Sequence, residues 1–161
     1  MIKILTTGGT IEGLDYETKR SENQESRISL EDFFRFSNVS FSYSFENVLN
    51  KDSRSITDED RQLLVDKIKA SSSEKIIVTH GTFTMEDTAK YIGKLNLNKT
   101  IVLVGSFILG TSKNTDAPFN LGYAACSVQF LKPGVYIAMN GTIFNWDNVR
   151  KNNHNNRFET I

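Results

Sequence analysis

Cysteine is almost absent from this sequence of 161 residues, in which Cys126 is the only one. A single cysteine excludes an internal disulfide, and a chain without disulfides fits a reducing compartment. Cys126 lies in the apolar stretch LGYAACSVQFL, whose spacing is helical. We expect it to be a small buried thiol rather than a nucleophile, because free cysteines behave mainly as buried apolar side chains.

An excess of either charge is also missing, since 19 Lys and Arg residues balance 19 Asp and Glu residues. The chain therefore has no overall electrostatic attraction to nucleic acid or to anionic membranes. The first residues, MIKILTTGG, lack the long apolar region and the cleavage site of a signal peptide. No apolar run approaches the roughly 20 residues that span a bilayer. We predict a cytoplasmic protein that binds neither nucleic acid nor membrane.

Short apolar runs do alternate with segments of helical spacing along the whole chain. The length favours one domain, residues 1–161, and the hydrophobic fraction of 39% is ordinary for a globular protein. The predicted strands cover 2–7, 39–45, 75–80, 100–106 and 134–139, and the predicted helices cover 29–37, 57–72, 85–95 and 117–131. This alternation predicts an α/β fold with βαβ units on a mainly parallel sheet. The polar segment 145–161 is either a frayed end or a segment that a partner chain orders.

Three loops follow predicted strands, which is where ligands bind in such sheets. They read TGGTIEG, THGTFTM and GSFILGTSKNTDAPFN. The first loop lacks the GK[ST] ending of a phosphate loop and the third glycine of a dinucleotide fingerprint. Either it is a plain tight turn, or it presents the Thr10 hydroxyl beside free N–H donors, as acyl transfer requires.

The second loop contains Thr82 and also His80, whose residue type suits acid–base chemistry. No carboxylate is near in the local sequence, so we favour a histidine that hydrogen-bonds within the turn. Phe83 is unexpected at the tip of such a turn, because a large ring has no polar role there. Lys151 in VRKNNHNN would, taken alone, be a solvated surface lysine. We find no metal-ligand cluster and no convincing cofactor loop, and predict neither a metal nor a cofactor.

Taken together, the stretches TGGTI, THGT followed by TM, and DAPFNLGYA resemble the bacterial-type L-asparaginase family in its amino-terminal domain. The resemblance runs from residue 2 to residue 158, and KDSRSITDEDR and PGVYIAMNGTIFNWDNVRKN are most similar to the short, single-domain members. It implies a three-layer α/β/α fold with a mainly parallel sheet. It further implies hydrolysis of asparagine to aspartate and ammonia through an acyl-enzyme, in a homodimer or homotetramer.

The resemblance also implies roles for individual residues. Thr10 matches the family's threonine nucleophile, and Thr82 and Lys151 match the second threonine and the lysine of the activating triad. Ser53 matches the serine that holds the α-carboxylate of the substrate. Tyr16 is the only tyrosine near the place of the family's assisting tyrosine, although its spacing from Thr10 is shorter. The other implied substrate-binding residues are Gly9, Arg54, Gly81 and Phe83.

The sequence departs from the family pattern at Phe83, where the family normally has the aspartate of HGTDT. In the family that carboxylate binds the α-ammonium of the substrate and supports the threonine–lysine pair. We therefore expect weaker binding of asparagine and loss of the counter-charge of Lys151. Ile108 and Leu109 stand where an arginine or glutamine followed by proline is usual, which makes the pocket more apolar. We also expect no carboxy-terminal domain, as in the short members.

Three functions remain open on these residues. The first is an amidohydrolase of asparaginase type. The second is a hydrolase for a modified or less polar amide that lacks a free α-ammonium. The third is a catalytically silent ligand-binding or structural member of the family. The presence of Thr10, Thr82 and Lys151 argues against the third, and Phe83 argues against an unmodified first.

Overall fold

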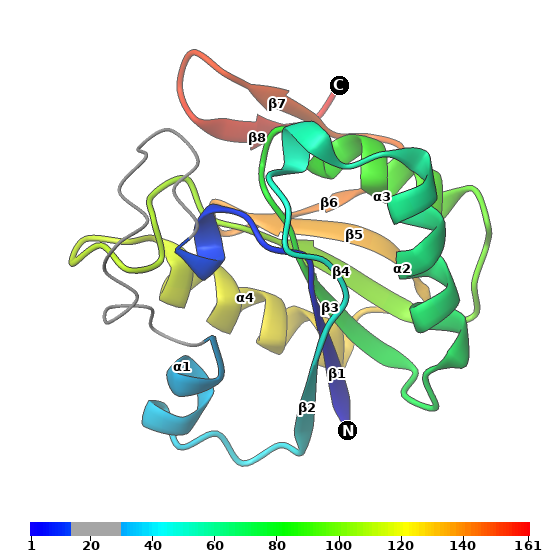
Figure 1. Cartoon of the computed structure of the whole chain (residues 1–161), viewed down its shortest axis with the longest axis horizontal. Coiled ribbons are helices and arrows are strands. Elements are labelled where there is room, and N and C mark those ends of the chain that lie inside the picture. Colours follow the sequence, from blue (N-terminus) through cyan, green and yellow to red (C-terminus); the bar gives the residue numbers. More distant parts are fainter. Residues whose placement is uncertain (14–29) are drawn as a thin grey trace.

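A six-stranded, mainly parallel sheet forms the centre of the molecule (Figure 1). The computed structural model describes residues 1–13 and 30–161. The strands, in spatial order, are β2 (Tyr43–Asn47), β1 (Ile2–Thr6), β3 (Lys75–Thr79), β4 (Thr100–Val104), β5 (Gly134–Met139) and β6 (Thr142–Asn145). All neighbours pair in parallel except β5 and β6, which are antiparallel. The carboxyl ends of β1, β3, β4 and β5 therefore meet at one edge, as the sequence predicts.

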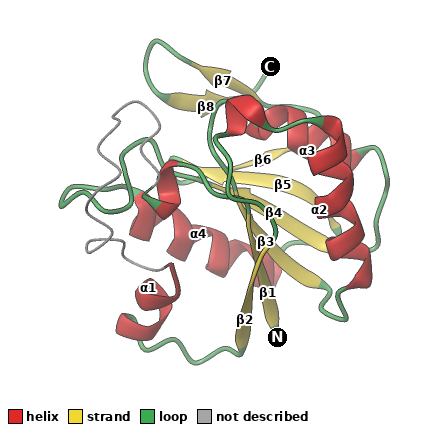
Figure 2. Cartoon of the chain, viewed as in Figure 1, coloured by secondary structure: helices red, strands yellow, loops and turns green. Residues whose placement is uncertain are grey.

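Helices cover both faces of this sheet (Figure 2). They are α1 (Leu30–Phe36), α2 (Asp58–Ala70), α3 (Met85–Gly93) and α4 (Ala117–Phe130). Helices α2 and α3 lie on one face, and α1 and α4 lie on the other. The predicted three-layer α/β/α architecture is thus confirmed.

The central strands are buried from both sides, which explains their nearly continuous apolar sequence. Ile76, Ile77 and Val78 of β3 have no exposed surface, and neither do the four residues after Thr100 in β4. Between the layers, the core is contiguous from the strands to the inner faces of the helices. This rigid sheet is the platform from which the loops at its carboxyl edge project.

The crossover through α4 has an unusual hand. Strands β3, β4 and β5 follow one another in the same direction across the sheet, yet α3 and α4 lie on opposite faces. The crossovers through α1, α2 and α3 share one hand, and that through α4 has the opposite one. Because about 98% of such crossovers are right-handed, the α4 connection is the left-handed exception. The segment after β4 consequently passes the first loop, where the N–H of Gly110 donates to the carbonyl of Thr10 over 2.9 Å.

The structure corrects the expectation for Cys126, which is exposed rather than buried. Helix α4 buries Leu121, Ala124 and Val128 on its inner side, while its outer side leaves Phe130 83% exposed. A helix that is apolar all round is normally buried, so the sequence pattern alone suggested burial for every side of α4. The outer side borders an open groove between α1 and α4, which Cys126 lines.

The carboxy-terminal segment contains strands that the sequence pattern does not reveal. Residues 134–139 continue through a tight turn into β6, and the hairpin β7 (Arg150–Asn152) and β8 (Arg157–Glu159) forms a second, two-stranded sheet. Strands of three or four residues are too short to show alternation. Phe158 anchors the hairpin, since it is 4% exposed and packs on the core. Among the described helices, none has the length and apolar character needed to cross a membrane.

Candidate functional site

A cavity of about 350 Å³ opens at the carboxyl edge of the sheet. Three sequence-distant loops after β1, after β3 and after β4 contribute to it, together with the segment before α2 and the β7–β8 hairpin. Its lining residues are Gly9, Thr10, Asp52, Ser53, Arg54, Gly81, Thr82, Phe83, Ser106, Phe107, Leu109, Lys151 and Asn156. Every site residue predicted from the sequence lines this cavity except Tyr16, which lies outside the described residues.

Thr82 and Lys151 form the central polar contact of the cavity. The Nζ of Lys151 donates to the Oγ1 of Thr82 over 3.1 Å, across 69 positions of sequence. Lys151 lies on β7, so the hairpin carries its ammonium to the loop after β3. Burial lowers the pKa of Lys151 below its ordinary value, because desolvation disfavours the charged form. A lysine in this condition loses its proton more readily than a surface lysine.

Glu86 supplies negative charge beside this lysine. Its Oε2 accepts a hydrogen bond of 3.1 Å from the backbone N–H of Lys151, and its charge acts to raise the pKa of Lys151, against the larger effect of burial. Phe83 supplies no carboxylate to Lys151, and part of the missing negative charge comes from Glu86. Glu86 is in the first turn of α3, three residues after Phe83, and was not singled out as a site residue from the sequence.

The loop after β1 is held in a compact shape by two glycines with positive φ, 96° at Gly8 and 89° at Gly9. A Cβ at Gly9 would lie 2.8 Å from the backbone nitrogen of Gly81, so only glycine allows the two loops to touch. The carboxylate of Glu12 fastens the loop to β3, because its Oε1 accepts from the N–H of Gly8 at 2.8 Å and from the Oγ1 of Thr79 at 3.0 Å. Thr10 sits in this fixed turn and faces the cavity.

Ser53 ties the segment before α2 to the loop after β3. Its buried Oγ accepts from the N–H of Phe83 over 3.2 Å, and its carbonyl accepts from the hydroxyl of Thr84 over 2.6 Å. A Cβ on Gly81 would lie 2.6 Å from the Ser53 Oγ, so the two residues are in direct contact. Ser53 is thus placed beside the loop that carries Thr82.

Phe83 lies between two cations at the mouth of the cavity. The guanidinium of Arg54 is 4.8 Å from the ring centroid, and the Nζ of Lys151 is 4.1 Å from it. The ring is 53% exposed. Arg54 also pairs with Asp52, with 2.9 Å between its Nε and the carboxylate. Since Asp52 is the only acidic residue among the described residues of the lining, the cavity carries more positive than negative charge.

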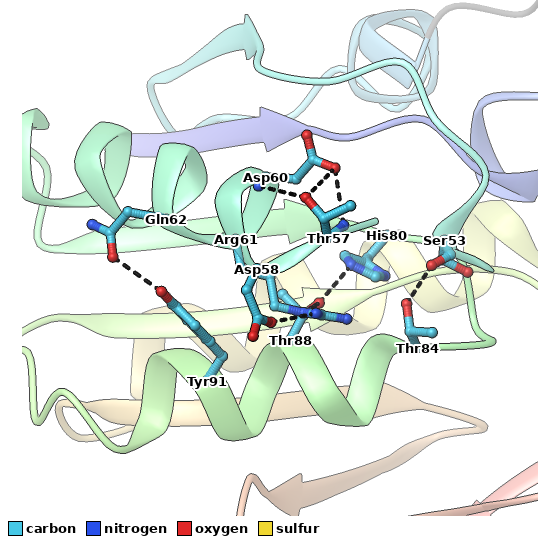
Figure 3. Close-up of polar contacts among 10 residues, drawn as sticks. All are labelled: Ser53, Thr57, Asp58, Asp60, Arg61, Gln62, His80, Thr84, Thr88 and Tyr91. Carbon is cyan, nitrogen blue, oxygen red and sulfur yellow. Dashed lines mark hydrogen bonds and ion pairs between the residues drawn. The ribbon is translucent and has the colours of Figure 1, made fainter. Parts of the chain in front are cut away.

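His80 does not face the cavity. Its ring is fully buried, with Nδ1 2.7 Å from the carbonyl of Gly81 and Nε2 2.9 Å from the hydroxyl of Thr88 (Figure 3). Burial lowers its pKa to about 4, so the ring is neutral at pH 7. The prediction of a histidine that hydrogen-bonds within the turn is confirmed.

The sequence reasoning did not identify five lining residues, although Leu109 was noted as a departure from the family pattern: Asp52, Ser106, Phe107, Leu109 and Asn156. Asn156 has a positive φ of 51° in the β7–β8 turn, and only the folded hairpin brings it to the cavity. Within residues 1–13 and 30–161, no three His, Cys, Asp or Glu side chains are grouped so that they could hold a metal ion.

Comparison with known proteins agrees with this geometry. The model of the asparaginase amino-terminal domain matches residues 1–161. The chain is 31% identical to L-asparaginase 2 of Escherichia coli, over 94% of this chain and 46% of that protein.

Two solved structures have the same fold. The thermostable L-asparaginase of Thermococcus kodakarensis superposes with a TM-score of 0.84 at 27% identity, over 99% of this chain and 51% of that one. The probable cytoplasmic L-asparaginase of Campylobacter jejuni gives a TM-score of 0.74 at 31% identity, over 93% and 49%. The chain spans about half the length of the relatives it matches. Because the amino-terminal domain model matches residues 1–161 and the fold is the same, the chain belongs to the asparaginase family.

Proposed function

We propose that the protein is an amidohydrolase of asparaginase type, which hydrolyses asparagine or a related primary amide to the acid and ammonia. The observation that carries this proposal is the hydrogen bond between Lys151 and Thr82 in a cavity that Thr10 also lines. A threonine hydroxyl has a high pKa and needs a base within hydrogen-bond reach before it can attack a carbonyl. Lys151 becomes such a base when it gives up its proton, and burial favours that loss.

The proposed reaction begins when the hydroxyl oxygen of Thr10 attacks the amide carbon of the substrate. The hydroxyl proton passes to the base formed by Thr82 and Lys151, and the amide nitrogen leaves as ammonia once it has been protonated. Water then hydrolyses the threonine ester, which releases the acid and restores the hydroxyl. Backbone N–H groups of the glycine loops, at Gly9 and Gly81, would stabilise the oxyanion, each by about 3 kcal/mol.

The remaining assignments concern substrate binding. Ser53 is proposed to hold the α-carboxylate of the substrate, with Arg54 adding positive charge at the mouth of the cavity. Tyr16 is proposed to assist the nucleophile from the segment between Gly13 and Leu30. No metal and no cofactor are required for this reaction.

A second candidate function is favoured by the surroundings of Phe83. An α-ammonium group needs a carboxylate partner, and the one carboxylate in the described lining, on Asp52, is paired with Arg54. An amide without a free α-ammonium, such as N-acetylasparagine, would avoid this unmet requirement. Its carboxylate would still be attracted by Arg54 and Lys151.

One assay tests the proposed function and separates the two candidates. Ammonia release is measured with asparagine, glutamine and N-acetylasparagine, using the unmodified chain, Thr10→Ala and Phe83→Asp. Turnover of asparagine that Thr10→Ala abolishes supports the first candidate. Preference for N-acetylasparagine that Phe83→Asp reverses supports the second. Lack of turnover of every amide by a folded protein would instead favour a silent, ligand-binding member of the family.

We also propose that the protein is a cytoplasmic homodimer or homotetramer, as the family resemblance implies. The exposed apolar side of α4 and α1 supports self-association, because contiguous apolar surface of this kind marks interaction sites. The name of the Campylobacter jejuni relative, a probable cytoplasmic enzyme, is consistent with the location.

A further inference from the structure

Three buried side chains form a continuous hydrogen-bonded line behind the cavity (Figure 3). Arg61 on α2 lies with its Nε 3.1 Å from the hydroxyl of Thr88 on α3. That hydroxyl is 2.9 Å from Nε2 of His80, whose Nδ1 is 2.7 Å from the carbonyl of Gly81. None of Arg61, Thr88 and His80 lines the cavity, so none is placed to touch a substrate.

The chemistry of these groups permits only one direction for the hydrogen bonds. The carbonyl of Gly81 can only accept, so Nδ1 of His80 must carry the proton and donate it. In a neutral imidazole Nε2 then has a lone pair, and the hydroxyl of Thr88 donates to it. The same hydroxyl oxygen accepts from Nε of Arg61. Every member is satisfied: the carbonyl of Gly81 sets the Nδ1–H tautomer of His80, and the hydroxyl of Thr88 donates to Nε2 and holds the ring in place.

The line of hydrogen bonds ends at Gly81, where the loops that form the cavity are in contact. The backbone of Gly81 is in contact with Gly9 of the first loop and with Ser53 of the segment before α2. Because a trans peptide unit is planar, fixing the carbonyl of Gly81 also fixes the N–H of Thr82, which points the opposite way. The imidazole therefore determines the orientation of the peptide that carries the second threonine.

We propose that Arg61, Thr88 and His80 are positioning residues, which hold the loop of Thr82 in its reactive geometry by keeping the imidazole where its Nδ1–H donates to the carbonyl of Gly81. This inference rests on the proposed amidohydrolase function, because it assigns these residues to the orientation of Thr82. They act on the rate of the chemical step rather than on binding of the substrate. Small displacements of reacting groups have large effects on rate, since about 1 Å can cost 100-fold.

The test uses Thr88→Val, which keeps the shape of the side chain and removes the hydroxyl. Nε2 of His80 then has no donor, so the imidazole loses the contact that holds it, and its hydrogen bond to the carbonyl of Gly81 is broken for part of the time. We expect kcat to fall by about 10-fold or more, with KM changed by less than about 2-fold. Thr88→Ser retains the hydroxyl, and we expect it to restore most of kcat.

Thr100→Val is the matched control. Thr100 is also a buried threonine, 4% exposed, and its hydroxyl donates to the carbonyl of Leu131 over 3.3 Å at the opposite edge of the sheet. A general loss of stability should lower Tm in both valine variants, whereas only Thr88→Val should lower kcat. Equal kcat values in the two variants would overturn the proposal.

A second measurement does not depend on turnover. Nitrogen-15 NMR of the imidazole at pH 7 reports which ring nitrogen carries the proton. We expect the Nδ1–H tautomer in all three proteins, and only in Thr88→Val a changed chemical shift of Nε2 together with faster hydrogen exchange at the Thr82 amide. An unchanged rate of hydrogen exchange at the Thr82 amide in Thr88→Val would refute the positioning role. If the unmodified protein hydrolyses no amide, the proposed function fails, and the Nε2 chemical shift and amide exchange alone decide whether this line orders the loop.

Discussion

The pKa of Lys151 is subject to opposing effects. Burial lowers its pKa, and the carboxylate of Glu86 raises it by a smaller amount. Its Nζ also lies over the rings of Phe83 and Phe107, at 4.1 and 5.6 Å from their centroids. Aromatic faces stabilise the charged form of a lysine. Two rings and one carboxylate thus favour the charged ammonium, against the effect of burial.

Replacing Glu86 by Gln should change the pH at which the enzyme works. Glutamine keeps an oxygen that accepts from the N–H of Lys151 but removes the negative charge. The pKa of Lys151 then falls further, so a larger fraction is unprotonated at a given pH. Because the proposed base must be unprotonated, the acidic limb of the kcat/KM profile should shift to lower pH, by about half a unit to one unit.

The control for this prediction is Glu159→Gln, on the β7–β8 hairpin that also carries Lys151. Glu159 pairs with Arg150 over 2.9 Å and does not line the cavity. Its variant should leave the acidic limb in place. An acidic limb that moves to higher pH in Glu86→Gln, or does not move, would show that Lys151 is not the base.

At the scale of elements, the start of α2 shows how well a local pattern can be read. The sequence predicts a capping box in which Asp60 replaces the usual Glu, and the structure contains both of its hydrogen bonds. The Oγ1 of Thr57 accepts from the N–H of Asp60 at 3.3 Å, and the carboxylate of Asp60 accepts from the N–H of Thr57 at 3.0 Å. The carboxylate of Asp60 also forms a salt bridge with the Nζ of Lys51 at 2.7 Å. This cap fixes the first turn of the helix that carries Arg61.

Thr57→Ala should therefore lower the free energy of unfolding by about 1 kcal/mol, since the N-cap acceptor is lost. Urea denaturation monitored by circular dichroism measures the change. Thr57→Ser keeps the hydroxyl and should retain most of the stability. Equal destabilisation by Ala and Ser would mean that the methyl group of Thr57, rather than its hydroxyl, is what matters.

Local patterns predicted the elements that are long and regular, and failed where the chain departs from regularity. The four helices and the parallel strands follow from apolar spacing. The one clear shift is the second strand, which was predicted at 39–45 and is observed as β2 at Tyr43–Asn47. The left-handed crossover through α4 could not be expected, because the general rule favours the opposite hand.

The site illustrates the same limit. Thr10 and Thr82 could be predicted as site residues because they lie in loops that follow strands. The contact between Lys151 and Thr82 joins residues 69 positions apart, so no local pattern indicates it. Only the family resemblance suggested it. Glu86 was missed because it reads as an ordinary acidic residue in a first helical turn.

For the whole molecule, the most conspicuous surface is the apolar groove between α1 and α4. Its volume is about 310 Å³, and Phe33, Phe34, Phe41 and Leu121 are among its lining residues. At its edge Phe36 is 74% exposed, and Phe130 is 83% exposed on the same helix face as Cys126. Burial of one such ring typically contributes about 2 kcal/mol. This surface is where we expect contact in the proposed homo-oligomer.

Sedimentation velocity at micromolar concentration should therefore show a dimer or tetramer. Phe36→Lys and Phe130→Lys should shift the distribution toward monomer, because a buried charge opposes the contact. Leu63→Lys on α2, where the side chain is 42% exposed on the other side of the sheet, serves as the control. A monomer alone in the unmodified protein would contradict the proposal.

The hairpin of β7 and β8 has one more consequence. It is hydrogen-bonded as a sheet of its own, and few of its side chains pack on the core. The main one is Phe158, whose ring centroid lies 6.0 Å from that of Phe107. Small units with few apolar contacts open at lower free energy than the domain that carries them. Release of this hairpin would withdraw Lys151 while the threonines stay on the intact sheet. On warming, activity would then be lost at a lower temperature than the one at which the domain unfolds.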